Sequence, residues 1–537
     1  MQRLPTYSRA LKRAGALGIA AAAASLAACS FIADFQECRT HADCKGADEP
    51  LACSAENTCV GVDDFPTCDS HQTCADAFGD DFLCGTAGKC ISAVTAACPS
   101  IAWPEGVSRD KVVFLGSMIP VSPPYDAITM PLQNAIELAV EDFNSTTALP
   151  GGRKVAWLAC DDRGISDVAV EAATHLVDEV GVQAIVGPLF SEEVLRVAKE
   201  VTIPAGAFLI SPTASNKTIT DLADDGLVWR TIPSDIYQSS AIRDRVLVDL
   251  DPKPASMVIL AKDDIYGDGI IEDTVPGLEA GGLQMTVIRY ADPTSFASDA
   301  ELLNAYSLVV AGAFDAQPDV LLIVGTSEAA QLIGAYIQTW SDLTPGDPLP
   351  RFMVSHGAVP ILEDVGAALD PALWPLLEGT SPIIQDPENF SAYNVRYKIR
   401  FNDQDALTTS SLSYDAAMVV MFSMATAGDV DITGARVAAG VARLVDKAGA
   451  AISFGGANLS FIKQTVDTLA SGANVDLRGV SGELDFDLAT GEVRTNIVGW
   501  DIQPKQGTTN VPVLTLARIY LLGEAPATTG VWMPLMP

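Results

Sequence analysis

Histidine is scarce in this 537-residue chain, and so are the motifs in which enzymes usually place it. Of the four histidines, His41 and His71 lie in a cysteine-rich region and His175 lies inside an expected helix. The sequence has no Gly-x-Ser-x-Gly elbow, no phosphate-binding glycine loop and no His-Glu-x-x-His. A triad built on His356 is the one enzymatic alternative left open. The scarcity of histidine and the absence of these motifs favour a binding protein over an enzyme. No cofactor is expected.

Positive charge is also scarce. The chain has 33 Lys and Arg against 68 Asp and Glu, a net charge of -35. Removal of an N-terminal leader that holds Arg3, Arg9, Lys12 and Arg13 leaves 29 against 68, or -39. Such a surface repels phosphate backbones and anionic lipid headgroups. Nucleic acid is therefore not an expected partner.

Long hydrophobic runs are absent after the first 29 residues. Ala14 to Ala28 is apolar but shorter than a membrane span, and basic residues precede it, as in a secretory signal. The run ends in Leu26-Ala27-Ala28-Cys29, which resembles the bacterial lipobox. The resemblance implies export and lipidation of Cys29, with residues 1–29 as the signal region. Ser30 in place of aspartate resembles the signal for outer-membrane sorting. A soluble secreted protein is the alternative.

Eight cysteines form two copies of one pattern in residues 30–97, with an offset of 30 or 31 residues between the copies. They are Cys38, Cys44, Cys53, Cys59, Cys68, Cys74, Cys84 and Cys90. Each copy is too short and too polar to fold by burial alone, so we expect two modules with two disulfides each, in any of three pairings. A zinc site is the alternative, because His41 and His71 lie between cysteines. Cys98 and Cys160 are left over, and the sequence does not establish whether they pair with each other.

Residues 98–537 alternate between expected strands and helices. The expected strands are 111–117, 155–159, 184–186, 207–210, 257–261, 283–290, 319–324 and 352–354. Helical patterns separate them, which is typical of parallel, doubly wound sheets. The run is too long for one sheet and predicts two α/β lobes. Val511 to Leu522 is expected to add a late strand.

Two hydroxyl-rich loops are expected at one edge of the first sheet. Ser191 follows one strand as the expected cap of a helix, and Thr213, Ala214 and Ser215 follow the next strand. Small ligands bind outside the carboxyl ends of parallel strands, where loop N–H groups converge. We expect this loop pair to contact a ligand. The alternative is that Ser191 only caps its helix and that the second loop is an ordinary turn.

Four groups of residues give the chain a resemblance to a known family. They are Arg230-Thr231 with Ser234-Asp235 and Gln238; Asp263 to Gly269; Tyr414-Asp415-Ala416; and Gly479 to Gly482 before Phe486-Asp487. In order and spacing they resemble the leucine/isoleucine/valine-type periplasmic solute-binding proteins of ABC transporters, which share the type I periplasmic binding fold. The resemblance implies a small-molecule ligand and a permease as partners.

The resemblance also implies three crossings between two closing lobes. Mapped here, they fall near residues 230–235, 355–358 and 481–484. Lobe 1 is then expected to comprise about 108–231 and 357–480, and lobe 2 about 235–354 and 483–525. In the family, a serine and the next loop hold the ligand carboxylate, which maps to Ser191, Thr213 and Ser215.

The chain departs from the family where an amino acid would be recognised. His356 stands where the family has a glutamate for the ligand ammonium, and Thr326 stands nearest to a family tyrosine. A buried ammonium without a carboxylate partner is costly, so an ordinary branched-chain amino acid is not expected unless Asp235 takes that role. A small polar or carboxylate-bearing solute is expected instead. A receptor or envelope regulator with the same fold is the second function considered.

Overall fold

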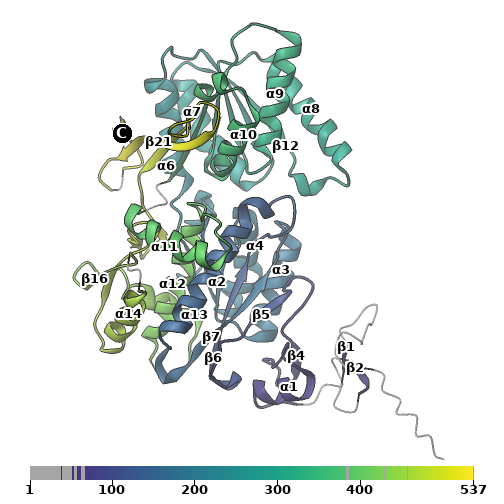
Figure 1. Cartoon of the computed structure of the whole chain (residues 1–537), viewed down its shortest axis with the longest axis vertical. Helices are drawn as coiled ribbons and strands as arrows, with labels where there is room; N and C mark the ends of the chain where they lie inside the picture. Colours follow the sequence, from purple (N-terminus) through teal and green to yellow (C-terminus); the bar gives the residue numbers. More distant parts are fainter. Residues whose placement is uncertain are drawn as a thin grey trace, which may run out of the picture.

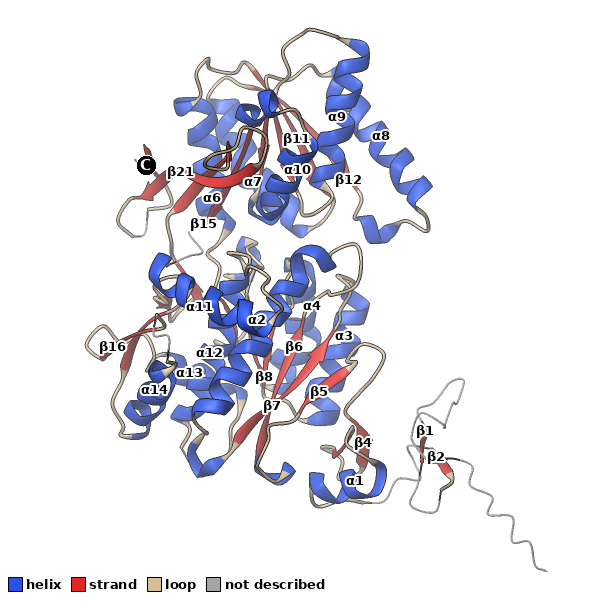
Figure 2. Ribbon diagram, viewed as in Figure 1, coloured by secondary structure: helices blue, strands red, loops and turns tan. Residues whose placement is uncertain are grey.

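The computed structural model describes residues 38, 51–53, 57–61, 67–382, 386–428, 430–455, 458–525 and 527–535. Two α/β lobes lie along the long axis of the molecule, and a small module sits at the far end of the first lobe (Figure 1). Helices flank the sheet of each lobe (Figure 2). The predicted pair of doubly wound lobes is confirmed. No helix of the described residues combines the length and apolar character of a membrane span.

Lobe 1 contains an eight-stranded sheet with the order β18-β19-β10-β9-β8-β6-β7-β5. The strands are β5 (Ser100–Ala102), β6 (Val112–Met118), β7 (Lys154–Cys160), β8 (Ala184–Val186), β9 (Phe208–Ser211), β10 (Val228–Arg230), β18 (Phe486–Asp487) and β19 (Glu492–Val493). Strands β19 to β7 pair in parallel, while β5 and β18 run antiparallel at the two edges. Every residue of β8 and β9 is buried, as expected for strands covered on both faces.

Two helical layers cover this sheet. One face carries α2 (Asp126–Thr146), α11 (Pro387–Arg400), α12 (Ser410–Thr426), α13 (Gly434–Val441) and α14 (Ser460–Ala470). The other carries α3 (Ser166–Thr174), which continues to Val180, and α4 (Ser191–Val197), which continues through α5 (Ile203–Ala205). A two-stranded side sheet consists of β16 (Ala450–Ser453) and β17 (Val475–Arg478). Helix α12 is buried from Ser410 to Ala425. Its sequence has one acidic residue, Asp415, and no lysine or arginine, so the helix can be packed on all sides.

Lobe 2 repeats the plan with the order β12-β11-β13-β14-β15-β20-β21-β22. Its strands are β11 (Ser256–Lys262), β12 (Gln284–Tyr290), β13 (Val320–Val324), β14 (Arg351–Val354), β15 (Leu377–Pro382), β20 (Ile497–Pro504), β21 (Pro512–Leu522) and β22 (Gly530–Pro534). Helices α6 (Asp235–Asp244) and α7 (Ile265–Ala280) pack on one face, and α8 (Asp299–Asp315), α9 (Ala329–Leu343) and α10 (Leu362–Ala368) on the other. The expected late strand is β21.

The chain crosses between the lobes three times, but two crossings lie later than expected. The first, between β10 and α6, is at the predicted place. After β14 the chain stays in lobe 2, because α10 packs on that core and β15 extends that sheet; it crosses between β15 and α11. Residues 481–484 are followed by β18 and β19, which still belong to the sheet of lobe 1, so the third crossing lies between β19 and β20. The expected boundaries at 355–358 and 481–484 are therefore wrong.

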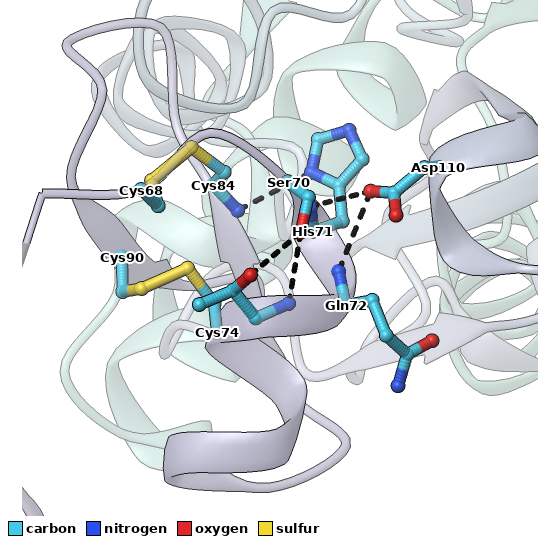
Figure 3. Close-up of a disulfide and its surroundings, with 9 residues drawn as sticks. Cys68, Ser70, His71, Gln72, Cys74, Cys84, Cys90 and Asp110 are labelled. Atoms are coloured by element: carbon cyan, nitrogen blue, oxygen red, sulfur yellow. Dashed lines mark hydrogen bonds between the residues drawn. A yellow bond between two sulfur atoms is a disulfide. The ribbon is translucent and has the colours of Figure 1, made fainter.

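The second cysteine module is stapled by two disulfides, Cys68–Cys84 and Cys74–Cys90 (Figure 3). They hold α1 (His71–Phe78) against the hairpin of β3 (Phe82–Cys84) and β4 (Cys90–Ser92). The His71 Nδ1 atom accepts a hydrogen bond from the backbone N–H of Cys84 at 3.2 Å. Its four cysteines are bonded to each other and offer no thiolates to zinc, so the expected two disulfides are confirmed for this module.

The first module is described only in part. Its hairpin consists of β1 (Leu51–Cys53) and β2 (Cys59–Gly61). Cys38 and Cys59 each take part in a disulfide. Cys44 lies outside the described residues, as does the expected anchor at Cys29.

The second module is attached to lobe 1. Asp110, at the base of the lobe, accepts hydrogen bonds from the backbone N–H groups of His71 at 2.7 Å and Gln72 at 3.4 Å, which begin α1 (Figure 3). A third disulfide, Cys98–Cys160, ties the connecting segment to β7, and β5 pairs with the edge of β7. The module is thus an extension of lobe 1.

Candidate functional site

The two lobes enclose a cavity at the carboxyl ends of their parallel strands. The parallel strands have the spatial order 2-1-3-4-5-6 in lobe 1 and 2-1-3-4-5 in lobe 2, so the order reverses beside β6 and β8 in lobe 1 and beside β11 and β13 in lobe 2. Ligands of open α/β sheets bind at such a reversal. About 660 Å³ of empty space, open solvent included, lies there. Its lining is Ile128, Thr129, Leu132, Leu189, Phe190, Ser191, Thr213, Ser215, Lys262, Asp264, Tyr266, Thr326, His356, Gly357, Pro360 and Thr409.

The loop after β8 brings Ser191 into this cavity. Gly187 has a φ of 106°, and a Cβ there would lie 2.2 Å from the carbonyl oxygen of Met118, so only glycine fits the turn beside β6. Phe190, not Ser191, occupies the N-cap position of α4, so the expected capping role is wrong. The Ser191 Oγ atom instead accepts a hydrogen bond from the N–H of Asn216 at 3.2 Å. Ser191 thereby joins the two predicted loops.

The loop after β9 brings Thr213 and Ser215 to the same place, but their hydroxyl protons are already used. The Thr213 hydroxyl donates to the carbonyl of Leu189 at 2.8 Å, and the Ser215 hydroxyl donates to Asp235 Oδ2 at 2.8 Å. Ala214 is buried, does not line the cavity, and donates its N–H to Ser211 Oγ at 3.1 Å. The location of the predicted pair is right. In this geometry both hydroxyl protons point at the protein, and the expected role of the two residues toward a ligand stays a prediction.

His356 lies in lobe 2, just after β14, and not at a crossing. Its Nδ1 atom is 3.0 Å from Gln238 Oε1 and 3.2 Å from the hydroxyl of Tyr266. The amide nitrogen of Gln238 donates to the carbonyl of Thr380 at 2.6 Å, and Gln238 Oε1 is therefore the atom that accepts a hydrogen bond from His356 Nδ1–H. Burial lowers the pKa of His356 to about 4, so the ring is neutral at pH 7.

Asp235 lies behind the cavity wall, where its carboxylate reaches Ser215 and is 3.8 Å from His356 Nδ1. Burial raises its pKa to about 7, against the opposite effects of the Ser215 hydrogen bond and the Arg230 charge. Asp235 does not line the cavity, so it supports the site from behind.

Thr326 lines the cavity from the loop after β13. Its hydroxyl donates to Glu328 Oε2 at 2.5 Å, and its N–H donates to Glu328 Oε1 at 3.0 Å. The buried carboxylate of Glu328, which also accepts from Tyr290 at 2.9 Å, was not predicted. The signal available in the sequence was a threonine, Thr326, followed two residues later by a glutamate, Glu328, directly after a buried strand.

Lys262 is the most consequential residue that the sequence reading missed. It ends β11, lines the cavity and forms an ion pair with Asp292, while Asp264 Oδ2 lies 3.7 Å away. Its ammonium group lies over the rings of Tyr125 and Phe190 of lobe 1, at 5.3 and 5.0 Å from their centroids. The Tyr125 hydroxyl donates to Asp292 Oδ2 at 2.5 Å. A lysine at the end of an otherwise apolar strand was the signal that could have revealed it.

Three solved structures illustrate the similarity of the fold. The leucine-binding protein LivK of Thermotoga maritima is 18% identical with a TM-score of 0.56, and the alignment covers 76% of this chain and 98% of that one. The substrate-binding protein LivJ of Streptococcus pneumoniae, in complex with isoleucine, is 16% identical with a TM-score of 0.54, covering 76% and 100%. An ABC transporter solute-binding protein of Rhodopseudomonas palustris, in complex with 3,4-dihydroxybenzoic acid, is 16% identical with a TM-score of 0.56, covering 76% and 96%.

Sequence comparison gives the family directly. No curated protein matches the sequence. The family model described as periplasmic binding protein matches residues 112–453, which is more than half of the chain. This family consists of binding proteins and receptors, and membership implies an extracytoplasmic location. With its two lobes, three crossings and interlobe cavity, this chain belongs to the periplasmic binding protein family, in the type I fold.

Proposed function

We propose that this protein is an exported, lipid-anchored solute-binding protein that captures one small polar solute between its lobes and delivers it to an ABC importer of the branched-chain amino acid type. The observation that supports this most is the shared cavity. Ser191, Thr213 and Ser215 of lobe 1 face Thr326 and His356 of lobe 2 across it. A solute there would contact both lobes, so its binding free energy would favour the closed form.

Contacts between the lobes surround the cavity and support closure as the capture step. Tyr125 of lobe 1 meets Lys262 and Asp292 of lobe 2, and Lys217 of lobe 1 pairs with Asp273 of lobe 2 at 2.7 Å. The similar structures bind leucine, isoleucine or dihydroxybenzoate according to their descriptions, which fits a family whose ligand changes with the cavity lining.

Capture is tested with mature protein that has been unfolded, dialysed free of ligand and refolded. Small-angle X-ray scattering should show a smaller radius of gyration after addition of the solute recovered from native protein. A radius that stays constant with bound solute would contradict closure around the ligand.

The proposed anchor is tested at Cys29, which lies outside the described residues. The Cys29→Ser variant should leave the membrane fraction, and the matched Ser30→Asp variant should remain membrane-bound but shift from the outer to the inner membrane. Retention of Cys29→Ser in membranes would contradict the anchor.

A receptor or regulator of envelope enzymes is the second candidate, because a stapled module is fixed to lobe 1. Crosslinking in intact cells distinguishes the two functions. Capture of a permease supports transport, whereas capture of a sensor kinase or wall-synthesis enzyme supports regulation.

A further inference from the structure

Four hydroxyl groups of the cavity share one orientation. Seven hydroxyl-bearing residues line it, and four of them donate their proton to the protein: Thr129, Thr213, Ser215 and Thr326. Their acceptors are the carbonyls of Pro120 and Leu189 and the carboxylates of Asp235 and Glu328. A hydroxyl has one proton and two lone pairs, so these four oxygens can still accept a hydrogen bond but cannot give one.

The acceptors that fix this orientation are buried. Asp235 is 2% exposed and Glu328 is 5% exposed, and each would be left with an unpaired carboxylate oxygen if the hydroxyl turned toward a ligand. Leaving a buried acceptor unpaired is costly. The hydroxyls of Ser215 and Thr326 are therefore held in the accepting orientation from opposite lobes.

The charges around the cavity act in the same direction. Lys262 is its one lining lysine or arginine among the described residues, and carboxylates of Asp264 and Asp292 already neutralise it. Burial keeps His356 neutral at pH 7. Glu328 adds a further carboxylate behind Thr326. The local balance is negative, which repels an anion and attracts a cation.

The remaining wall is apolar. Ile128, Leu132, Leu189 and Phe190 line lobe 1, and Pro360 lines lobe 2. These side chains fit a hydrocarbon or aromatic body and offer it no hydrogen bonds. Donors do remain, because Ser191, Tyr266, Thr409 and Lys262 also line the cavity. Lys262 already has partners, and the Tyr266 hydroxyl lies 3.2 Å from His356 Nδ1.

We propose that the cavity selects a solute with an apolar body that presents hydrogen-bond donors, an amine or a hydroxyl, and that it discriminates against carboxylates. This inference rests on the proposed function and names its ligand class. Thr213 and Ser215 accept from the donor on the lobe 1 side, and Thr326 accepts on the lobe 2 side. The ligand closes the lobes because its donors need acceptors from both.

Three probes with the same 4-hydroxyphenyl body test this: 2-(4-hydroxyphenyl)ethylamine, 2-(4-hydroxyphenyl)ethanol and 4-hydroxyphenylacetate, with L-leucine added as the family ligand. Calorimetry of ligand-stripped mature protein should show the amine or the alcohol binding at least tenfold more tightly than the acid and leucine. If only the amine binds tightly, the selection rests on positive charge. If the alcohol binds as tightly as the amine, the selection rests on neutral hydrogen-bond donors. Tightest binding of the acid or of leucine would overturn the inference.

Variants locate the effect. Thr213→Val and Thr326→Val should each weaken the preferred probe about tenfold, and Ser215→Ala should do the same if either valine variant fails to fold. Thr465→Val, which removes a buried hydroxyl of α14 that bonds within its own helix, should bind as wild type. Unchanged binding by all three site variants would overturn the inference. Failure of every probe together with the absence of any solute in native protein would count against the proposed function itself.

Discussion

Lys262 and Tyr125 show how single residues connect closure to binding. Burial opposes a charge on Lys262, but Tyr125, Glu328, Asp292 and Asp264 raise the pKa well above its usual range, so the ammonium persists. The same ammonium lies over aromatic rings of the opposite lobe, an attractive arrangement when water is excluded. Tyr125 therefore contributes mainly in the closed form.

Tyr125→Phe should weaken ligand binding while changing the stability of each lobe little. A hydrogen bond to a charged partner contributes about 1.5 to 3 kcal/mol, which corresponds to an affinity loss of roughly 10- to 100-fold. Calorimetry with the solute recovered from native protein measures it. Tyr306→Phe is the control, because the Tyr306 hydroxyl donates to Ala291 within lobe 2. Equal affinity of Tyr125→Phe and wild type would contradict a contribution of Tyr125 to the closed form.

Asp235 and His356 should give opposite pH dependences. The pKa of Asp235 rises from 3.8 to about 7, so the folded state holds its proton more tightly and this contribution to stability is lost as pH rises from 3.8 to 7. The pKa of His356 falls from 6.5 to about 4, so its contribution is lost as pH falls from 6.5 to 4.

Relative to wild type, the free energy of unfolding of Asp235→Asn should rise with pH between 4 and 6.5, and that of His356→Gln should fall over the same range. One proton accounts for at most about 1.4 kcal/mol per pH unit. Urea unfolding at several pH values measures both slopes. Parallel pH profiles of both variants and wild type would show that these groups do not titrate as described.

At the scale of elements, α12 and the turn after β17 explain two of the sequence motifs that carried the resemblance. Asp415 accepts hydrogen bonds from the N–H groups of Val480 at 2.9 Å and Ser481 at 2.7 Å. A Cβ on Gly479 would lie 2.3 Å from the Asp415 carboxylate, so this glycine lets the turn approach the helix. The motifs are structural, and neither residue group lines the cavity.

Most of the predicted strands were predictable because they are short, buried apolar runs bounded by a turn. Strand β12, at the edge of its sheet, is the mostly exposed exception. The strand at β15 was not predicted, since Leu377-Glu378-Gly379-Thr380-Ser381-Pro382 carries a glutamate and two hydroxyls. Its burial depends on a distant partner: Glu378 pairs with Arg245 at 2.8 Å and with Arg518 at 3.3 Å. Such compensation is tertiary and leaves no local pattern. For the same reason the sequence placed Thr213 and Ser215 correctly but not the direction of their hydroxyls.

The Cys98–Cys160 bridge should stabilise lobe 1, because it closes a loop between the connecting segment and β7. It closes a segment of 62 residues, for which the chain-entropy relation gives about 4 kcal/mol. The Cys98→Ala/Cys160→Ala double variant should lose about that much in guanidinium unfolding. The matched Cys68→Ala/Cys84→Ala variant, which opens a 16-residue segment, should lose about 3 kcal/mol. No loss in either variant under oxidising conditions would contradict the described bridges.

At the scale of the molecule, the displaced crossings decide where the site residues lie. Because β15 keeps the chain in lobe 2, His356 belongs to the wall of lobe 2 and faces Thr213 of lobe 1 across the cavity. Arg230, which is 1% exposed and ends β10, forms an ion pair with Glu492 of the neighbouring strand β19, so the two strands that lead into the first and third crossings are tied together in the sheet of lobe 1. Because residues of both lobes line the cavity, relative motion of the lobes would change its shape.

The most direct test of the account is native mass spectrometry of the mature protein, compared with a Thr409→Trp variant. Thr409 lines the cavity, so the larger side chain should fill it without disturbing a buried hydrogen bond. The account predicts one small molecule per wild-type chain, released on unfolding, and none on the variant. A wild-type protein that carries no solute and takes up none from a broad panel, or a variant that binds as wild type does, would contradict it.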